Sequence, residues 1–274
     1  MNAASQRAIL QVHELRKYFP VTRGLLQKET AEVKAVDGID FSIMKDETLG
    51  LVGESGCGKT TTGRLILNLE AANSGFIQFE GKDITHPGKN ESRALKKDMQ
   101  IIFQDPFASL NPRMTVGQII AEPLTVRKLV PDTTAARRRV AELLGDVGLP
   151  LYMTERYPHQ LSGGQRQRVG IARALALEPS TIICDEPVSA LDVSVQAQII
   201  NLMLDLREQL GLAYLFIAHD LNLVRRVCDR VAVMYLGKIV ELADADTIYK
   251  DPRHAYTKAL LDAIPLPDPS IERE

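Results

Sequence analysis

The chain has 274 residues, enough for one large α/β domain or a domain with an attached lobe, and its 33 basic and 35 acidic side chains leave a net charge of −2. This balance argues against a nucleic-acid binder that works by bulk charge and leaves a local basic groove open; we expect no nucleic acid among the partners. The three cysteines form no CxxC pair, no apolar run reaches bilayer length and the N-terminus lacks a signal-peptide core, so we expect a cytoplasmic protein.

The first part of the chain predicts strands on either side of one glycine-rich loop. Strand patterns occupy residues 8–19, 35–44, 75–84 and 99–105. The polar stretch 22–32 favours a loop between the first two strands. Residues 48–55 form an apolar run that ends in glycine, and residues 59–69 have helical spacing. The order of strand, glycine loop and helix is typical of a phosphate-binding unit.

Residues 106–160 change in character from strands to helices. Helical spacing occurs at 115–124 and 132–149, and no strand pattern interrupts it. The apolar stripe of the second helix consists of Val140, Leu143, Leu144 and Val147. We interpret the basic run 137–139 as a solvated helix face. The segment predicts an inserted helical lobe.

Strand patterns return after this lobe. Residues 180–186 and 213–220 are apolar runs joined by helical sequence, which favours central strands of a parallel sheet. Residues 230–242 predict a hairpin that turns at Gly237. The proline-rich and charged residues 264–274 predict a loose tail.

The glycine-rich loop, GESGCGKTT, matches the pattern G-x-x-x-x-G-K-[ST]. Its glycines let backbone N–H groups face phosphate oxygens, Lys59 neutralises the β and γ phosphates, and the Thr60 hydroxyl can coordinate Mg²⁺. The predicted cofactors are therefore ATP and Mg²⁺. The predicted nucleotide-binding residues of this loop are Gly53, Glu54, Ser55, Gly56, Cys57, Gly58, Lys59, Thr60 and Thr61.

Cys57 lies inside this loop, beside a predicted helix N-terminus and Lys59. Both features favour the thiolate form. The alternative is that a small residue merely fits at this position.

Acidic and polar residues follow three of the predicted strands. Asp185 can hold the Mg²⁺ shell, and Glu186 is then placed to polarise the attacking water. An acidic turn without function is the alternative, and the nearby phosphate loop argues against it. His219 can serve as a structural residue or donate a hydrogen bond to the γ-phosphate, and Gln104 can reach the metal or the water.

A second glycine-rich turn, LSGGQ, spans residues 161–165. Ser162 and Gln165 form a capping box, so the turn can simply start a helix. Gly163 and Gly164 reduce helix stability, however, and leave N–H groups bare, which favours an anion site. Since the chain already has one phosphate cradle, we expect this turn to bind the ATP of a second chain in a head-to-tail dimer.

Together these motifs resemble the ATP-binding subunit of ABC transporters. The motifs are residues 53–61, Gln104, LSGGQ, IICDE (182–186), SALD (189–192) and His219. The resemblance implies a catalytic set of Glu186, His219 and Gln104, and a metal set of Thr60, Gln104 and Asp185. It adds Ser162, Gly163, Gly164 and Gln165 to the nucleotide contacts. It also implies that Asp192 links the two sites across the dimer, and that an aromatic residue stacks on adenine, Phe19 or else Tyr18.

Residues 104–124 and 254–269 are similar to the peptide/nickel importer branch of this family. The implied cargo is a di- or oligopeptide, with nickel or glutathione as alternatives. No cysteine follows Cys228, so the cysteine-bearing extension of many members is not expected; a shortened chain or one half of a fused protein is possible.

The resemblance implies an α/β fold with a P-loop NTPase core, a mainly parallel sheet, an N-terminal antiparallel β portion and an inserted helical lobe. We expect a single ABC ATPase domain. Its parts are a core at 8–105 and 161–250, a helical subdomain at 106–160 and a tail at 251–274.

The predicted function is ATP hydrolysis that drives separate membrane subunits, at the inner face of the cell membrane. The implied partners are a second ATP-binding subunit, identical or paralogous, two integral membrane permeases and, indirectly, an extracytoplasmic substrate-binding protein. A soluble relative acting on DNA or ribosomes is the alternative. The chain has neither the long coiled coil or zinc module of the DNA-acting proteins nor the second cassette of the ribosome-acting ones.

Overall fold

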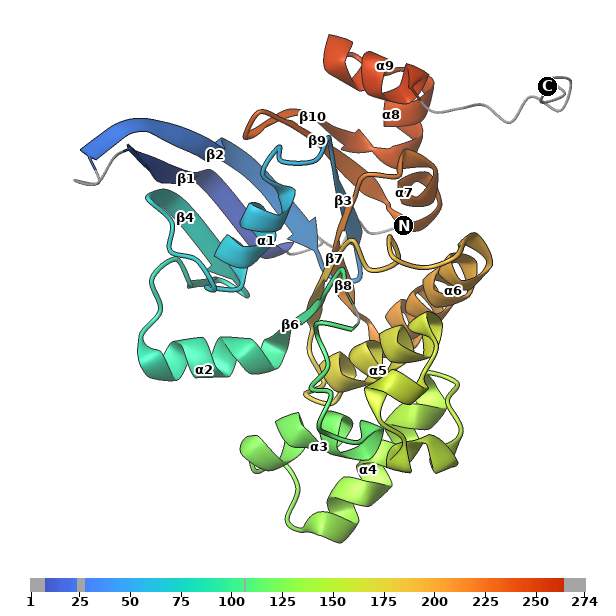
Figure 1. Cartoon of the computed structure of the whole chain (residues 1–274). Helices are drawn as coiled ribbons and strands as arrows, with labels where there is room; N and C mark the ends of the chain where they lie inside the picture. The colour runs from blue at the N-terminus through green and yellow to red at the C-terminus, as the bar shows by residue number, and fades with distance from the viewer. Residues whose placement is uncertain (1–7, 24–27, 106, 264–274) are drawn as a thin grey trace, which may run out of the picture.

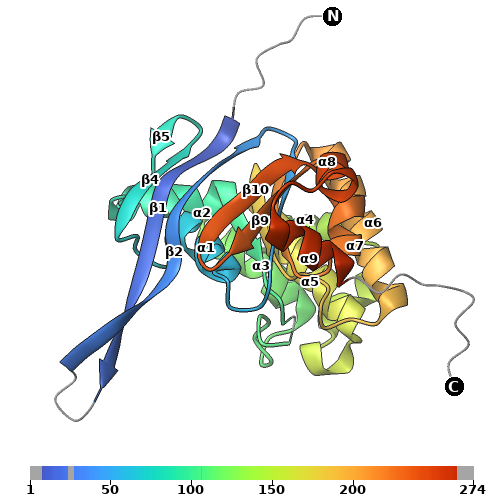
Figure 2. The same ribbon diagram turned by 90° about the horizontal axis from the view of Figure 1, so that it is seen from above.

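The computed structural model describes residues 8–23, 28–105 and 107–263, which form two sheets and a group of helices (Figure 1). The antiparallel sheet has the order β2-β1-β4-β5. Its strands are β1 (Ala8–Arg23), β2 (Lys28–Met44), β4 (Ser74–Phe79) and β5 (Lys82–Asp83). Strands β1 and β2 form a long hairpin that extends to one side of the molecule (Figure 2).

This hairpin is longer than the sequence predicted. Much of the expected loop at 22–32 is strand, because Val21 pairs with Ala31 and Pro20 with Glu32. Backbone groups can form a ladder whatever side chains they carry, so a polar hairpin end gives little strand signal. The loop prediction was therefore wrong over most of its length.

The second sheet has the order β10-β9-β3-β8-β7-β6 and is parallel except for the β9–β10 pair. Its strands are β3 (Thr48–Val52), β6 (Met99–Ile102), β7 (Thr181–Asp185), β8 (Ala213–Ala218), β9 (Arg230–Tyr235) and β10 (Lys238–Asp244). The parallel central strands and the terminal hairpin turning at Gly237 confirm the predictions. The left-handed Leu236 and Gly237, with φ of 45° and 82°, form that turn.

The central strands are buried on both faces, and alternate residues enter two different cores. In β8, Tyr214 and Phe216 pack with the helical core, whereas Leu215 and Ile217 pack with the core shared by the antiparallel sheet. This explains why these strands read as continuous apolar runs. Helix α1 (Lys59–Ile66) lies in the second of these cores.

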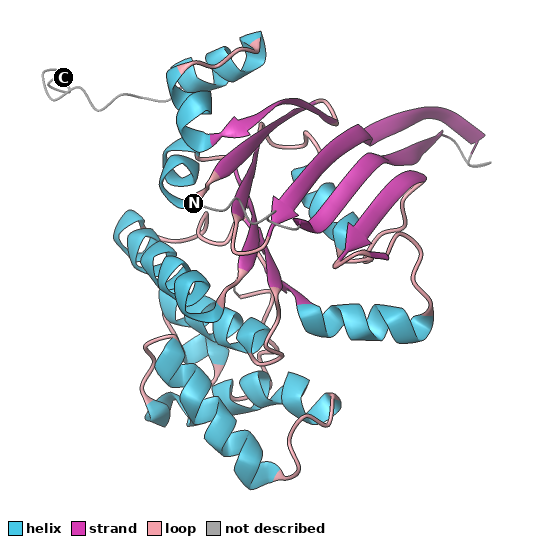
Figure 3. Ribbon diagram, turned by 180° about the vertical axis from the view of Figure 1, so that it is seen from behind, coloured by secondary structure: helices cyan, strands magenta, loops and turns pink. Residues whose placement is uncertain are grey.

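The helices α3, α4 and α5 gather on the side of the molecule away from the N-terminal sheet (Figure 3). Their bounds are α3 (Val116–Val126), α4 (Thr133–Asp146) and α5 (Gly163–Leu175), with short turns η1 (Leu151–Glu155) and η2 (Pro158–Gln160) before α5. The predicted helices are confirmed, and the stripe of α4 is buried. The predicted tail at 264–274 lies outside the described residues.

The sequence did not predict α2 (Lys89–Asp98), which has no buried residue and hence no apolar stripe. Its start is marked by Gly88, whose N–H donates to Glu91 Oε2 at 2.8 Å. The remaining helices are α6 (Val193–Leu210), α7 (Leu221–Val227), α8 (Ala245–Lys250) and α9 (Ala255–Asp262). Within the described ranges, none of the helices is long and apolar enough to span a membrane.

Candidate functional site

The phosphate loop, residues 53–58, connects the end of β3 to the start of α1. Its two outer glycines are required by close packing: a Cβ on Gly53 would lie 2.1 Å from the Met234 carbonyl oxygen, and a Cβ on Gly58 would lie 2.0 Å from that of Ala35. Both glycines also have positive φ, at 153° and 113°. The glycine spacing of the motif therefore fixes both the shape of the loop and its fit against β2 and β9.

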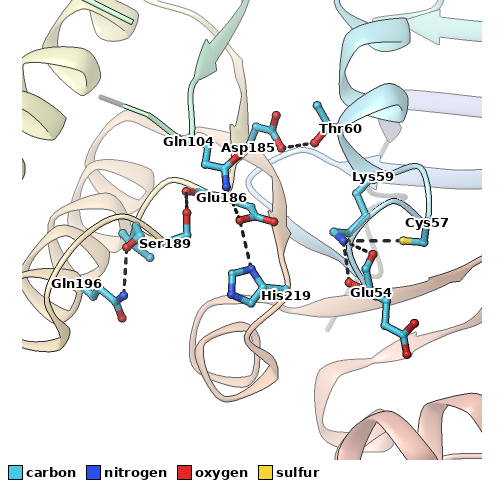
Figure 4. Close-up of polar contacts among 12 residues, drawn as sticks. Glu54, Cys57, Lys59, Thr60, Gln104, Asp185, Glu186, Ser189, Gln196 and His219 are labelled. Atoms are coloured by element: carbon cyan, nitrogen blue, oxygen red, sulfur yellow. Dashed lines mark hydrogen bonds and ion pairs between the residues drawn. The ribbon is translucent and has the colours of Figure 1, made fainter. Parts of the chain in front are cut away.

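The ammonium group of Lys59 lies inside the loop. It donates hydrogen bonds to the carbonyl oxygens of Gly53 at 2.7 Å and Glu54 at 2.9 Å (Figure 4). The side chain is buried, with 5% exposed. A buried cation within a turn of backbone N–H groups is suited to bind an anion, and a phosphate would compete with the two carbonyl oxygens for this ammonium.

Thr60 and Asp185 meet beside the loop, where α1 begins and β7 ends. The Thr60 hydroxyl donates to Asp185 Oδ1 at 3.0 Å. Burial raises the pKa of the Asp185 carboxyl, and the Thr60 hydrogen bond opposes this shift. A hydroxyl and a carboxylate are oxygen donors that fit Mg²⁺, and a cation here would compensate the buried charge. Within the described residues no group of three or more metal-ligating side chains forms, so phosphate and water would complete the shell.

Glu186 is held between Gln104 and His219. Its Oε2 accepts a hydrogen bond from Gln104 Nε2 at 2.9 Å and lies 3.2 Å from His219 Nδ1 (Figure 4). These residues follow β6, β7 and β8, which are neighbours in the sheet. Because the strands are parallel, their carboxyl ends share one edge, and this brings the three predicted catalytic side chains together.

The backbone of Glu186 is left-handed, with φ of 47°, and its N–H donates to the Ile217 carbonyl oxygen at 2.9 Å. A non-glycine residue in this conformation carries strain, which the surrounding contacts must offset. Ser189 Oγ donates to the Glu186 carbonyl oxygen at 3.1 Å, and Gln196 Nε2 donates to that of Leu191 at 2.9 Å. The turn after β7 is thus held from both ends. Sequence reasoning included Ser189 only as the first residue of the SALD motif and missed Gln196, because a side-chain hydrogen bond to backbone leaves no motif of its own.

The Ser162 turn caps α5 as the sequence predicted. Ser162 Oγ accepts from Gln165 N at 3.3 Å, and Gln165 Oε1 accepts from Ser162 N at 3.0 Å. Close packing requires the glycine at position 164, which the sequence did not reveal. A Cβ on Gly164 would lie 2.4 Å from Val195 Cγ1, because α5 and α6 approach closely here. Among the described residues, no hydrogen bond or ion pair joins this turn to the phosphate loop. A role for the turn in binding phosphate stays a prediction.

The two candidate aromatic residues of β1 differ in how they are engaged. The Tyr18 hydroxyl donates to Asp37 Oδ1 at 2.5 Å, and the Lys34 ammonium lies 5.3 Å from its ring centre. Phe19 is 36% exposed and has the Lys17 ammonium 4.9 Å from its ring centre. Phe19 therefore keeps more free ring surface for stacking, and its role also stays a prediction.

Cys57 does not have the environment that the sequence suggested. We expected the helix N-terminus and Lys59 to favour a thiolate. The thiol is instead 6% exposed, and burial raises its pKa in spite of Lys59 Nζ at 3.8 Å from the sulfur. Desolvation of the charged form outweighs the nearby cation, so the expectation of a thiolate was wrong.

One further contact was not predictable from a motif. The Glu54 N–H donates to the hydroxyl of Tyr256, in the C-terminal helix α9, at 3.2 Å. A residue far along the chain thus reaches the phosphate loop.

Comparison with family models gives two matches. The model described as ABC transporter matches residues 36–189, and the model described as oligopeptide/dipeptide transporter, C-terminal region, matches residues 240–274. The first match covers more than half of the chain and contains the phosphate loop, Gln104 and the Asp185–Glu186 pair. The second covers most of β10 and all of α8 and α9.

Curated relatives match almost the whole chain. The oligopeptide transport ATP-binding protein OppF of Bacillus subtilis is 55% identical over 97% of this chain and 85% of its own length. The Escherichia coli protein of the same name is 49% identical over 100% of this chain and 83% of its own length. The glutathione import ATP-binding protein GsiA of Escherichia coli is 52% identical over 97% of this chain, which spans 42% of that protein.

Solved structures share the fold. One is cbiO1 from Clostridium perfringens, part of the ABC transporter complex cbiONQ, with a TM-score of 0.76, 27% identity and coverage of 89% of this chain and 91% of the other. Another is a dimeric ATP-binding cassette in a post-hydrolysis state with ADP and Pi, with a TM-score of 0.75, 26% identity and coverage of 86% and 98%. The predicted α/β fold with its antiparallel N-terminal sheet is confirmed, and the chain belongs to the ABC transporter family and is an ATPase of that family.

Proposed function

We propose that this ATPase is the motor subunit of an ABC importer for di- or oligopeptides. The observation that carries the ATPase mechanism is the convergence of Gln104 and His219 on one oxygen of Glu186, beside the Thr60–Asp185 pair. The peptide cargo is supported by the names of the relatives and by the C-terminal match at 240–274. Glutathione is the second candidate, because a glutathione importer is also about half identical.

In this proposal ATP binds to residues 53–61. Its phosphates bind the Lys59 ammonium in competition with the carbonyl oxygens of Gly53 and Glu54, to which Lys59 donates. Thr60, Asp185 and Gln104 would supply the protein oxygens for Mg²⁺. When bound, Mg²⁺ neutralises charge that develops on the phosphates.

Glu186 then orients and polarises the attacking water, since its carboxylate is already fixed by Gln104 and His219. One carboxylate oxygen, Oε2, carries both recorded contacts, which leaves Oε1 to accept the proton of the water. His219 Nδ1 contacts Glu186 Oε2, which leaves the other ring nitrogen of His219, Nε2, to donate a hydrogen bond to the γ-phosphate.

The active sites are shared between two chains in a head-to-tail dimer. The Ser162 turn has the exposed serine and the capped helix start expected of an anion site. One similar cassette structure is also dimeric. Asp192, at the start of α6 and without a side-chain cap hydrogen bond, is then available to contact the partner.

The dimer works with two membrane permeases and, through them, with an extracytoplasmic substrate-binding protein, as a peripheral protein on the inner face of the membrane. The docking surface lies after Gln104, where Phe107 is 52% exposed and has the Arg166 guanidinium 5.0 Å from its ring centre. A cysteine at Phe107 should crosslink to a cytoplasmic loop of a permease. A cysteine at Val33, which is exposed on β2, is the control and should not crosslink there.

Transport by the assembled complex in proteoliposomes tests the cargo. Labelled di- and oligopeptides should accumulate only with internal ATP, and the variant Lys59→Ala should abolish uptake. Glutathione or Ni²⁺ uptake without peptide uptake would assign the alternative cargo. ATP hydrolysis that is never coupled to any of the three would contradict the importer proposal.

A further inference from the structure

The outer side of the phosphate loop is held by the C-terminal part of the chain. The Gly237 N–H, at the β9–β10 turn, donates to the Cys57 carbonyl oxygen at 3.0 Å. The Tyr256 hydroxyl, at the start of α9, accepts from the Glu54 N–H at 3.2 Å. These two hydrogen bonds join the loop to the C-terminal part of the chain, and Tyr256 is the partner that uses a side chain.

Tyr256 itself is held in place by its neighbours. Glu241 of β10 accepts from the N–H groups of Arg253 at 2.8 Å and His254 at 3.0 Å, which fixes the entry to α9. His254 Nδ1 accepts from the Tyr256 N–H at 3.1 Å and caps the helix. The Tyr256 ring packs on that of Tyr235, with ring centres 4.2 Å apart. This support explains how a terminal helix, beside β10 in Figure 1, can place one hydroxyl accurately on a distant loop.

The peptide groups of Glu54 are held from both sides. Its N–H donates to the Tyr256 hydroxyl, which we call the outer hydrogen bond. Its carbonyl oxygen accepts from Lys59 Nζ at 2.9 Å, which we call the inner hydrogen bond. An incoming phosphate competes for the Lys59 ammonium, so the inner hydrogen bond is weakened when nucleotide binds. The Gly53–Glu54 peptide bond is trans, so the Glu54 N–H points away from the Gly53 carbonyl oxygen that Lys59 binds. The outer hydrogen bond to Tyr256 therefore does not depend on the Lys59 ammonium, and we expect it to remain.

We propose that Tyr256 is a positioning residue that holds the phosphate loop in its nucleotide-binding shape while Lys59 moves from the loop carbonyls to the phosphates. The C-terminal region, whose sequence matches the oligopeptide/dipeptide transporter model, thereby contributes to ATP affinity. The proposal rests on ATP binding by the phosphate loop and is independent of the transported cargo.

The test is the variant Tyr256→Phe in the purified full-length chain. The ring stays packed on Tyr235, and only the hydroxyl that accepts from Glu54 is lost. One hydrogen bond has a net value that corresponds to about a two- to tenfold change in an equilibrium constant, so the Kd for ATP should rise by that factor. In the assembled complex KM for ATP should rise in parallel, while kcat at saturating ATP should remain unchanged because no reacting group is altered.

Tyr235→Phe is the matched control. It removes a hydroxyl from the other ring of the same pair, and that hydroxyl makes no hydrogen bond to any residue the structure describes. Affinity for ATP should equal that of the wild type. Cooperative thermal unfolding verifies that both variants fold. The Tm of Tyr235→Phe should match the wild type, and that of Tyr256→Phe should fall by no more than about 2–4 °C, the effect of one lost hydrogen bond.

Hydrogen exchange provides a readout that a general loss of packing would not give. The Glu54 amide should exchange faster in Tyr256→Phe than in Tyr235→Phe, both without and with ATP. Unchanged Kd in Tyr256→Phe, or an equal loss in both variants, would overturn the proposal. If Tyr256→Phe fails to fold, the milder variant Glu241→Gln, which weakens the hold on the α9 entry, should raise the Kd; a wild-type Kd there would also overturn it.

Discussion

Gln104 donates its side-chain N–H to Oε2 of Glu186 at 2.9 Å and thereby joins the end of β6 to the end of β7. The segment after Gln104 carries the exposed Phe107, so one hydrogen bond connects the carboxylate proposed to activate water with the surface proposed to contact the permease. A displacement of this segment would change the hold on Glu186. Such a hinge is a direct way to couple docking to hydrolysis.

Glu186→Gln should bind ATP normally but hydrolyse it about 10²- to 10⁴-fold more slowly, because the base is lost while the shape is kept. The variant should also accumulate as an ATP-bound dimer. Single-turnover hydrolysis and size-exclusion chromatography with ATP measure the two effects. Near-normal turnover would remove Glu186 from the role of base.

Asp185→Asn should stabilise the nucleotide-free protein at neutral pH. Burial raises the pKa of Asp185, so the folded state binds the proton more tightly than the unfolded state, and the free energy of unfolding falls as the pH rises through the carboxyl range. Asparagine removes this penalty. Melting curves near neutral pH should show a higher Tm for the variant than for the wild type.

The pH dependence separates this explanation from a change in packing. The gain in Tm should shrink as the pH falls below the ordinary carboxyl range, where Asp185 is protonated in both states. Mg²⁺ with ATP should stabilise the wild type more than the variant, because the variant keeps the phosphate loop but loses one Mg²⁺ ligand. A gain that is equal at all pH values would contradict the electrostatic origin.

Cys57 should react slowly with a maleimide at neutral pH, because burial raises its pKa and limits access. The rate should increase about tenfold per pH unit until the thiol titrates. Labelling should inactivate the ATPase, and ATP should slow it further by covering the loop. Mass spectrometry of the labelled peptide, with Cys57→Ala as the control, measures the rate; a rate that ATP leaves unchanged would argue against nucleotide contact.

Mixing two inactive variants tests the shared active site. Lys59→Ala damages the phosphate loop of its own chain, and Ser162→Arg blocks the turn by bulk, so each variant alone should be nearly inactive. In a mixed dimer one site carries both defects and the other carries none. Random pairing makes about half of the dimers mixed, so about a quarter of wild-type ATPase activity should return if the sites work independently.

Strong coupling between the two sites would reduce this recovery, and a paralogous native partner would require one mutation in each gene. Native mass spectrometry of the mixture verifies that mixed dimers form. Absence of any recovery in verified mixed dimers, with each ATP contacting only its own chain, would assign the Ser162 turn to helix capping alone.

The sequence was sufficient to predict those parts of the structure that a local pattern of residues determines. The phosphate loop, the capping box at Ser162 and Gln165, and the buried strand before Asp185 are each encoded within a few residues, and the structure has them. Gln104, Glu186 and His219 were separate candidates at strand ends. Their meeting depends on the strand order β8-β7-β6, which only the sheet provides.

The features that were missed depend on long-range contacts or on polar sequence. The hydrogen bond from Glu54 to Tyr256 joins residues 202 positions apart and has no motif. The thiol of Cys57 has a raised pKa because of side chains and backbone that pack around it, and a neighbouring lysine in the sequence could not reveal this burial. Helix α2 and the end of the β1–β2 hairpin are polar, so hydrophobic periodicity could not predict the secondary structure of either segment.

The place of β3 in the sheet has a consequence for synthesis of the chain. Val52, directly before the phosphate loop, pairs with Ala218 of β8 and Val233 of β9, which leave the ribosome long after it. The antiparallel sheet can form early from nearby segments. Until β8 and β9 are synthesised, β3 remains an apolar strand whose backbone N–H and C=O groups are unpaired at both edges. A product that stops before β9 would lack this closure, so premature termination late in the gene should yield aggregating chains that cannot bind nucleotide.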